Sequence, residues 1–258
     1  MKDQERELYK KYFAKFPGSA IWLIVIGVLC IPLYGIGIIP LIIGIIMIVQ
    51  WNKKPTDAEF DTMRNNDISE VEKLALKKLN LTEYDMVREP VVIYSPRFWN
   101  IAGAEIGFKR GKDDVVRYMP IDITIIAFTE HKLIIYQCVL DLTTGRPLNV
   151  CIKKFFYEDI VAIETMSETQ TIHASDLSKR YKEQFPEHKK YLEDNKLQLN
   201  SVEQFVLTSK AGVAVKINLP DPSIIESIGK AGNLPLGIAE QAIAAVETML
   251  DEKKKGVV

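Results

Sequence analysis

The residues best suited to ligand chemistry lie in and beside one predicted turn. Lys109, Arg110 and Lys112 fall within four residues, and Arg117 follows on the next predicted strand. Arginine binds phosphate through a planar fork of donors, and lysine binds it as a point charge. These residues therefore form a candidate site for anionic lipid headgroups. Two aspartates directly follow Lys112 and favour the alternative, an ordinary solvated turn.

Residues that could support catalysis or bind metal lack the necessary spacing. His131, His173 and His188 are isolated from one another and from the cysteines. No glycine-rich phosphate loop and no nucleophile-elbow serine motif is present in the sequence. We therefore expect no catalytic residues, no metal, no cofactor and no small-molecule substrate.

The chain is organised around Ala20–Val49, a run of apolar and small residues without a charged side chain. A span needs about 20 apolar residues, so this run is long enough for one tilted helix or two short arms. Pro32, Gly35, Gly37 and Pro40 crowd its middle, where they would break a helix. We predict a helical hairpin over residues 20–51 that is either transmembrane or re-entrant.

The flanks of this run are typical of a membrane anchor. Trp22 and Trp51 lie near its outer ends, where an interfacial aromatic belt would place them, and Lys53 and Lys54 follow directly. Further basic residues precede it: Lys2, Arg6, Lys10, Lys11 and Lys15. Positive charge at both ends favours two termini on the cytoplasmic side. A buried core hairpin and a cleaved signal peptide are the alternatives.

Two helical segments are expected beside the hairpin. Residues 1–19 alternate charged and aromatic positions, which predicts an amphipathic segment at the membrane surface; the alternative is a frayed terminus. Residues 55–87 read as a helical linker with capping boxes at Thr56–Glu59 and Asp67–Glu70. The two boxes predict two helices with a break near Asn65.

From Glu89 onward the apolar period changes to two, which predicts short antiparallel strands joined by tight turns. Nine such runs occur: 91–94, 104–108, 115–119, 121–128, 132–140, 148–156, 160–165, 204–208 and 213–219. A turn centred on Thr144-Gly145 would place Cys138 opposite Cys151. We expect both to be core-facing side chains, with a redox switch as the alternative.

A charged segment, residues 167–202, is predicted to interrupt the sheet as a helical insertion. It is either a solvated excursion or a partner-binding arm, for which the candidate residues are Lys179, Arg180, Tyr181, Phe185 and Tyr191. The last element is an amphipathic helix over residues 235–255, which needs a sheet or barrel to cover its apolar stripe.

Charge and cysteine content narrow the function classes. The net charge is −1, but residues 1–54 hold seven Lys or Arg and three Asp or Glu, so the remainder is acidic. An acidic domain is a poor candidate for nucleic acid binding. Three cysteines are too few and too unevenly spaced for a disulfide framework.

The strand pattern resembles bacterial pleckstrin-homology-like (PH-like or GRAM-like) domains. The similarity is sharpest at residues 125–136 (IIAFTEHKLIIY) and 156–164 (FYEDIVAIE). It implies an α+β fold: a membrane helical hairpin, then an antiparallel PH-like β-barrel or sandwich over residues 88–258, capped by a C-terminal helix. Lys132 stands where the family often has arginine, and the insertion splits strands that are usually adjacent.

Taken together, these patterns favour a membrane-anchored, non-enzymatic scaffold in the bacterial inner membrane. Its partners would be the lipid bilayer, other proteins and further copies of itself, because glycines in the hairpin allow close helix approach. A membrane-disrupting effector and an anionic-lipid sensor are the alternatives.

Overall fold

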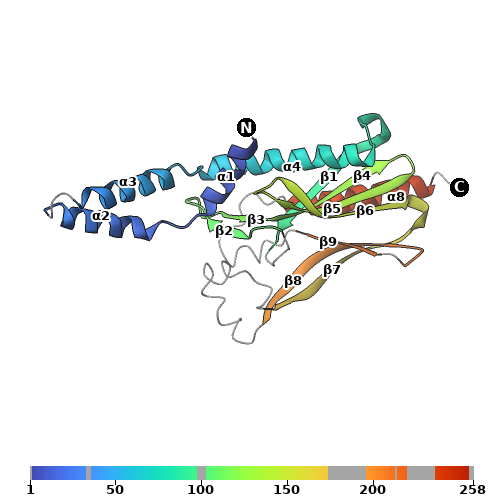
Figure 1. Ribbon diagram of the computed structural model, residues 1–258. Coiled ribbons are helices and arrows are strands. Elements are labelled where there is room, and N and C mark those ends of the chain that lie inside the picture. Colours follow the sequence, from blue (N-terminus) through green and yellow to red (C-terminus); the bar gives the residue numbers. More distant parts are fainter. Residues whose placement is uncertain are drawn as a thin grey trace. The chain divides into compact units, whose positions relative to one another are not determined.

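The computed structural model describes residues 2–32, 36–97, 103–173, 196–212, 214–219 and 236–255 (Figure 1). The chain is α+β and divides into an N-terminal unit, Met1–Met63, and a C-terminal unit, Arg64–Val258. Its described residues form five α-helices and nine strands, and every strand pair is antiparallel. All nine predicted strands are confirmed, most of them with longer bounds.

The N-terminal unit is helical. It contains α1 (Lys2–Phe13), α2 (Gly18–Cys30), α3 (Ile38–Asn52) and the start of α4 (Asp57–Leu79). The two arms α2 and α3 form a hairpin, as the proline and glycine positions predict (Figure 1). Gly35, a predicted turn residue, lies outside the described residues.

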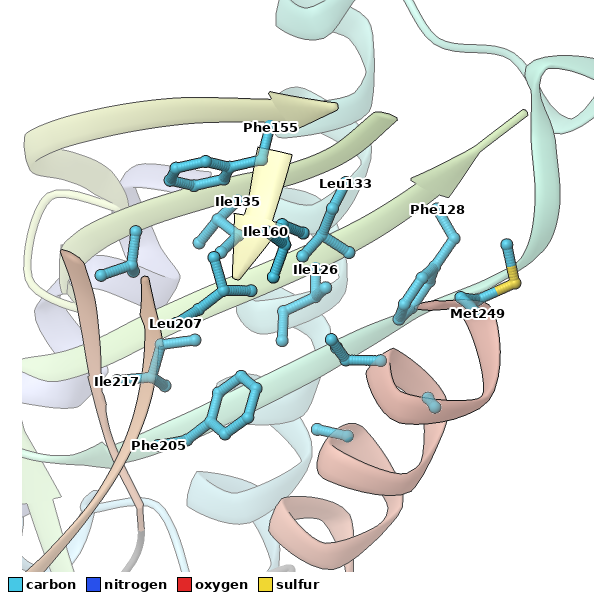
Figure 2. Packing of buried hydrophobic residues seen from close by; sticks show 14 of the residues in the cluster. Ile126, Phe128, Leu133, Ile135, Phe155, Ile160, Phe205, Leu207, Ile217 and Met249 are labelled. Carbon is cyan, nitrogen blue, oxygen red and sulfur yellow. The ribbon is translucent and has the colours of Figure 1, made fainter. Parts of the chain in front are cut away.

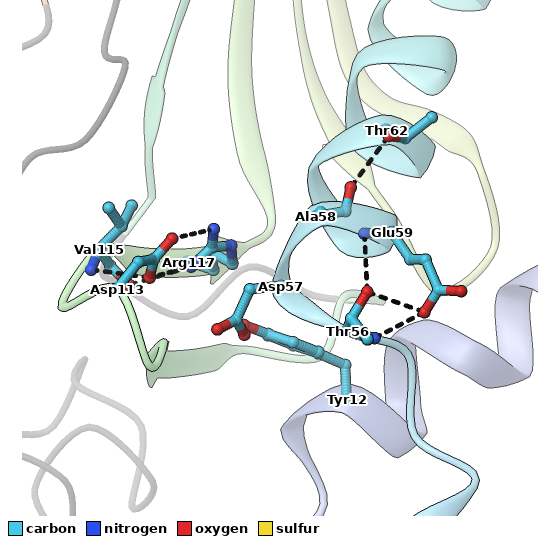
Figure 3. A network of polar contacts seen from close by, with 9 residues as sticks. All are labelled: Tyr12, Thr56, Asp57, Ala58, Glu59, Thr62, Asp113, Val115 and Arg117. Atoms are coloured by element: carbon cyan, nitrogen blue, oxygen red, sulfur yellow. Dashed lines mark hydrogen bonds and ion pairs between the residues drawn. The ribbon is translucent and has the colours of Figure 1, made fainter.

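The linker contains one α-helix where the sequence predicts two. The amide of Thr56 donates to Glu59 Oε2 at 2.7 Å and the amide of Glu59 donates to Thr56 Oγ1 at 3.2 Å, so the first capping box starts α4 (Figure 3). The predicted break near Asn65 is wrong, because α4 continues through it to Leu79. It ends where Asn80 adopts a left-handed φ of 55° and Leu81 N donates to Leu76 O, a Schellman cap.

The C-terminal unit contains three sheets. The four-stranded sheet has the order β1 (Met86–Pro96), β4 (Ile121–Thr129), β5 (Lys132–Asp141) and β6 (Arg146–Phe156). A three-stranded sheet joins β7 (Ile160–His173), β8 (Lys196–Ser209) and β9 (Ala214–Asn218), and β2 (Gly107–Arg110) pairs with β3 (Val116–Met119). In the described residues these sheets pair only within themselves, so of the predicted barrel or sandwich a closed barrel is not formed there.

The main core lies between the two larger sheets and α8 (Leu236–Lys255). Figure 2 shows Phe128 of β4, Leu133 of β5 and Phe155 of β6 in this core, with Phe205 of β8 and Met249 of α8. The apolar stripe predicted for the last helix is confirmed, because Ala242, Ala245, Val246 and Met249 are all buried.

The opposite face of the four-stranded sheet is also buried. Antiparallel register puts Tyr94, Ile123 and Cys138 on that face, away from the main core. The guanidinium carbon of Arg64 lies 5.9 Å from the Tyr94 ring centroid, so α4 packs on this side. Ile68, Val71, Ala75 and Leu79 of α4 recur at helical spacing and are buried.

The charged segment does not interrupt the sheet where predicted. Ser167 pairs with Glu203, Gln170 with Leu199 and His173 with Lys196, so β7 and β8 extend as a long ribbon into residues 167–202. The predicted strands 160–165 and 204–208 cover only part of β7 and β8, so the sequence reasoning missed this extension. The candidate partner residues Lys179, Arg180, Tyr181, Phe185 and Tyr191 lie outside the described residues.

The predicted pairing of the cysteines is wrong. Asp141 pairs with Arg146, which makes the turn two residues tighter than expected, and a bulge at Cys138 shifts the register again. Cys151 therefore stands opposite Gln137. Cys138 is buried, whereas Cys151 is exposed, so only Cys138 is a buried side chain as expected.

Candidate functional site

The α2–α3 hairpin is packed through its small residues. An added Cβ on Gly27 would lie 2.7 Å from the backbone nitrogen of Leu41, and one on Gly44 would lie 2.8 Å from the carbonyl oxygen of Ala20. Gly37 is tighter still, at 2.0 Å from the carbonyl oxygen of Gly27. These glycines close the hairpin on itself. The expectation that they support contacts between copies is therefore not supported, because their space is occupied within one chain.

The outer surface of the hairpin is apolar and exposed. Trp22 has 67 % of its surface exposed, and Ile36 beside the turn has 66 %. The other large exposed side chains of the two arms are Ile21, Val25, Ile26, Val28, Leu29, Ile31, Ile38, Ile39, Ile42, Ile43, Ile45, Ile46 and Val49. No charged residue lies between Lys15 and Lys53. Contiguous apolar surface of this kind marks an interaction site for lipid or protein.

The two ends of the hairpin are tied together in what we call the hairpin base, made of Ala14, Phe16, Trp51 and Lys54. The Phe16 and Trp51 rings meet edge to face, with centroids 5.0 Å apart. Lys54 Nζ lies 4.2 Å from the Trp51 ring centroid and also donates to the Ala14 carbonyl oxygen. The base therefore combines amphipathic rings with positive charge, as at membrane interfaces.

The aromatic face of α1 is not available to lipid. Tyr9, Tyr12 and Phe13 are buried around Phe60 of α4, and the Tyr12 and Phe60 rings stack with centroids 4.5 Å apart. Tyr12 Oη also donates to Asp57 Oδ1 at 2.6 Å (Figure 3). The amphipathic helix forms as predicted, but this face packs against protein instead of the membrane surface.

The β2–β3 hairpin brings the four predicted headgroup residues together and pairs both of its arginines internally. Lys109 is directly opposite Arg117 in the ladder. Arg117 is only 2 % exposed, and its guanidinium donates to both carboxylate oxygens of Asp113, at 2.9 and 2.7 Å (Figure 3). Arg110 lies 3.4 Å from an oxygen of Asp114. The Arg117 side chain is thus turned inward, away from any headgroup.

These hydrogen bonds also set the charge state of the turn. The Arg117 guanidinium beside Asp113 holds the pKa of that carboxyl well below its usual range. Asp113 is therefore ionised at neutral pH and cancels one positive charge. Lys112 is exposed and Lys109 is half-buried. The lipid-headgroup assignment stays a prediction, and Arg110 and Lys112 are its exposed cations.

A polar cavity of about 250 Å³ opens at the end of the four-stranded sheet. Ser95, Arg97, Asp122, Thr124 and Gln137 contribute to its lining. Arg97 Nη1 lies 2.7 Å from Asp122 Oδ1, and burial raises the pKa of Asp122 while the arginine opposes that rise. Among the described residues, Asp122 is the one carboxylate of this lining, which also contains Lys216, Cys138 and Cys151.

The side chains of Cys138 and His131 lie in different environments. Burial raises the pKa of the Cys138 thiol to about 12, so the thiol is protonated and unreactive at neutral pH. His131 is exposed in the turn between β4 and β5, as the sequence predicts. Within the described ranges, no three His, Cys, Asp or Glu side chains gather as metal ligands would.

Comparisons with known proteins do not identify a family for this chain. No protein-family model matches the chain, and neither a curated protein nor a solved structure does. No single described helix combines the length and apolarity needed to cross a membrane. Two pairs of helices, α1 with α2 and α3 with α4, are long and apolar enough together, but each pair is sharply bent between its helices.

Sequence reasoning missed the cluster of aromatic rings around Phe60. The aromatic spacing of α1 is visible in the sequence, but the partner ring lies far along the chain.

Proposed function

We propose that this protein is a membrane-anchored, non-enzymatic scaffold that presents its C-terminal unit on the cytoplasmic face of a bacterial inner membrane. The outer surface of the α2–α3 hairpin carries the proposal. Its large apolar side chains are exposed along a run without a charged residue. Such a surface is costly in water at about 25 cal/mol per Å² and is stable in lipid.

The base of the hairpin supports an orientation. Five lysines lie next to the apolar run, and no acidic residue occurs between Glu7 and Asp57. Both ends of the run carry this charge, and anionic cytoplasmic headgroups attract it. We propose that both termini lie in the cytoplasm. The five lysines are Lys10, Lys11, Lys15, Lys53 and Lys54.

The order of elements in the C-terminal unit supports a PH-like domain. An antiparallel four-stranded sheet precedes an antiparallel three-stranded sheet, and the chain ends in a helix whose apolar face enters their shared core. The PH-like plan has this order, if the β2–β3 hairpin is an insertion after the first strand. We propose that this unit binds proteins, including further copies of the chain.

Vesicle flotation tests the anchor. The full-length protein should float with phosphatidylcholine–phosphatidylglycerol vesicles and stay bound in 1 M salt. The double variant Ile26→Asp, Ile43→Asp should lose more than about tenfold in bound fraction, because each intramembrane carboxylate costs about 2.5–3.5 kcal/mol. Val161→Asp is the matched control, since Val161 is exposed on the C-terminal unit.

Salt-sensitive binding, or equal flotation of the double variant, would contradict the anchor. Vesicles that hold a trapped dye separate the scaffold from a membrane-disrupting effector: the scaffold retains the dye at high protein load. Chemical crosslinking in native membranes tests self-association, and a purely monomeric pattern would contradict a homo-oligomeric scaffold.

A further inference from the structure

We propose that the α2–α3 hairpin enters only one leaflet of an anionic bilayer, so that its turn ends near the bilayer centre and the chain leaves on the side it entered. This inference rests on the proposed membrane anchor and adds its depth. It assigns the exposed apolar surface of the hairpin to one leaflet of lipid.

Helix length is the first argument. The arm α2 has 13 residues and α3 has 15. At 1.5 Å per residue these arms are roughly 20 and 22 Å long, against a hydrocarbon core of about 30 Å that needs about 20 helical residues. Each arm is therefore too short to cross and longer than the roughly 15 Å of one leaflet.

The hairpin base accounts for the remaining length. Trp51 packs on Phe16 and lies under the ammonium group of Lys54, a combination suited to the headgroup level. From Trp51 to Ile38 the α3 helix descends by about 20 Å. With the base among the headgroups, the start of α3 lies close to the middle of the bilayer.

The chemistry of the turn agrees with that depth. Residues 31–37 (IPLYGIG) contain no charged side chain that would hold the turn among the headgroups of the far leaflet. Pro40 lies in the first turn of α3, where amide hydrogens have no acceptor within the helix. Proline has no amide hydrogen, so Pro40 removes a donor that lipid could not satisfy.

The packing of the two arms makes the hairpin a preformed wedge. Gly27 and Gly44 allow the backbones of the two arms to approach closely, so separation of the arms would break these contacts. A unit held together this way would insert or withdraw as a whole.

Depth and sidedness of single cysteines test the inference in the full-length chain. The background carries Cys30→Ser and Cys151→Ser, and keeps Cys138 because it is buried. Ile36→Cys reports on the turn and Asn52→Cys reports on the base, both in phosphatidylcholine–phosphatidylglycerol vesicles. A membrane-impermeant maleimide is added outside or trapped inside, and a fluorophore on each cysteine is quenched by nitroxide lipids of known depth.

We expect Asn52→Cys to react from one side only. From either side, Ile36→Cys should react at least about tenfold more slowly than Asn52→Cys does from its accessible side, because the thiolate that reacts requires water. Its fluorophore should be quenched best by the deepest nitroxide.

The other outcomes separate the two proposals. Reaction of Ile36→Cys from the side opposite to Asn52→Cys, with quenching by shallow nitroxides, would show two full crossings; it would overturn the depth while leaving the anchor intact. Reaction of both from one side without deep quenching would also overturn it, since the hairpin would then lie on the surface. Failure to float with the vesicles would remove the anchor itself.

Discussion

Arg117 shows how a neighbouring residue changes what a basic side chain can do. As one of four cations in a short segment, it resembles part of a phosphate site. In the fold it is buried and clamped by both oxygens of Asp113. A bidentate pair of this kind has defined geometry and fixes the β2–β3 turn. The exposed cations of the predicted headgroup site are Arg110 and Lys112.

Substitution of Asp113 should therefore destabilise the protein. Asp113→Asn leaves the guanidinium of Arg117 buried without its carboxylate, and we expect a loss of about 1 kcal/mol in the free energy of unfolding, a value reduced by the partial exposure of Asp113. Asp114→Asn is the control, because its pair with Arg110 is half-exposed on both sides and should change stability by less than about 0.5 kcal/mol. Urea unfolding in mild detergent measures both.

The same pair predicts a pH dependence. The folded pKa of Asp113 is depressed, so its contribution is complete above the ordinary aspartate value near 4 and is lost as the pH falls through the lower folded pKa. The stability difference between the native chain and Asp113→Asn should be constant from pH 8 to 5 and shrink below about pH 4. A difference that instead grows in acid would contradict this assignment.

At the scale of elements, the attachment of α1 depends on one ring. Phe60 is fully buried among three aromatic side chains of α1. Phe60→Ala should cost about 3–5 kcal/mol locally, enough to release α1 from the start of α4. The α1 amides should then exchange hydrogen at rates near those of an isolated helix that is not packed against protein. Tyr84→Ala is the control, because Tyr84 is 100 % exposed, and unchanged α1 exchange in Phe60→Ala would refute the attachment.

The close packing of the α2 and α3 arms also predicts an effect on stability. Gly27→Ala places a methyl group 2.7 Å from the Leu41 backbone nitrogen, so the two arms must move apart at a cost of about 1–3 kcal/mol. Gly18→Ala, where an added Cβ meets nothing within 4 Å, should have little effect. Titration of mixed micelles with a denaturing detergent, followed by tryptophan fluorescence, compares the two. Equal midpoints would mean that the close packing of the arms does not contribute to stability.

The elements also show how far sequence reasoning extends in this protein. The strands were predictable because their residues alternate, and the hairpin because Pro32 and Pro40 interrupt an apolar run. The extension of β7 beyond Thr165 and of β8 before Gln204 was missed, because the many charges between Glu168 and Lys196 predicted an insertion instead of paired strands. The bulge opposite Cys138 has only a weak local signal, Asn149 with a left-handed φ of 50°, and α4 stays whole at Asn65 because its buried stripe outweighs a capping box.

The candidate site was predictable to a similar degree. The apolar run, its tryptophans and its lysines identified the hairpin. The cations near Lys109 were expected in one turn, but Lys109 and Arg110 lie in β2 and Lys112 lies in the turn. What could not be read was their pairing: the ring of Trp51 on Phe16, the lysine over it, and Arg117 turned inward toward Asp113. These contacts depend on side chains brought together by folding, and periodicity contains no information about them.

At the scale of the whole molecule, the chain exposes its residues to three environments. The main core excludes water, the four-stranded sheet has an exposed edge at β6, and the hairpin surface is suited to lipid. Each of the three cysteines lies in a different environment. Cys138 is buried in the C-terminal unit, Cys151 is exposed on β6, and Cys30 ends α2 in the apolar hairpin.

This distribution predicts the labelling of the folded protein in lipid. Only Cys151 should react quickly with a water-soluble maleimide at pH 7.5, because reaction needs a hydrated thiolate. Cys138, whose pKa burial raises to about 12, should react only after global unfolding, and Cys30 only after the lipid is removed. Mass spectrometry of timed labelling distinguishes the sites, and Cys151→Ser should abolish the fast phase. A second fast site in intact bilayers would mean that either the hairpin or the core is open to water.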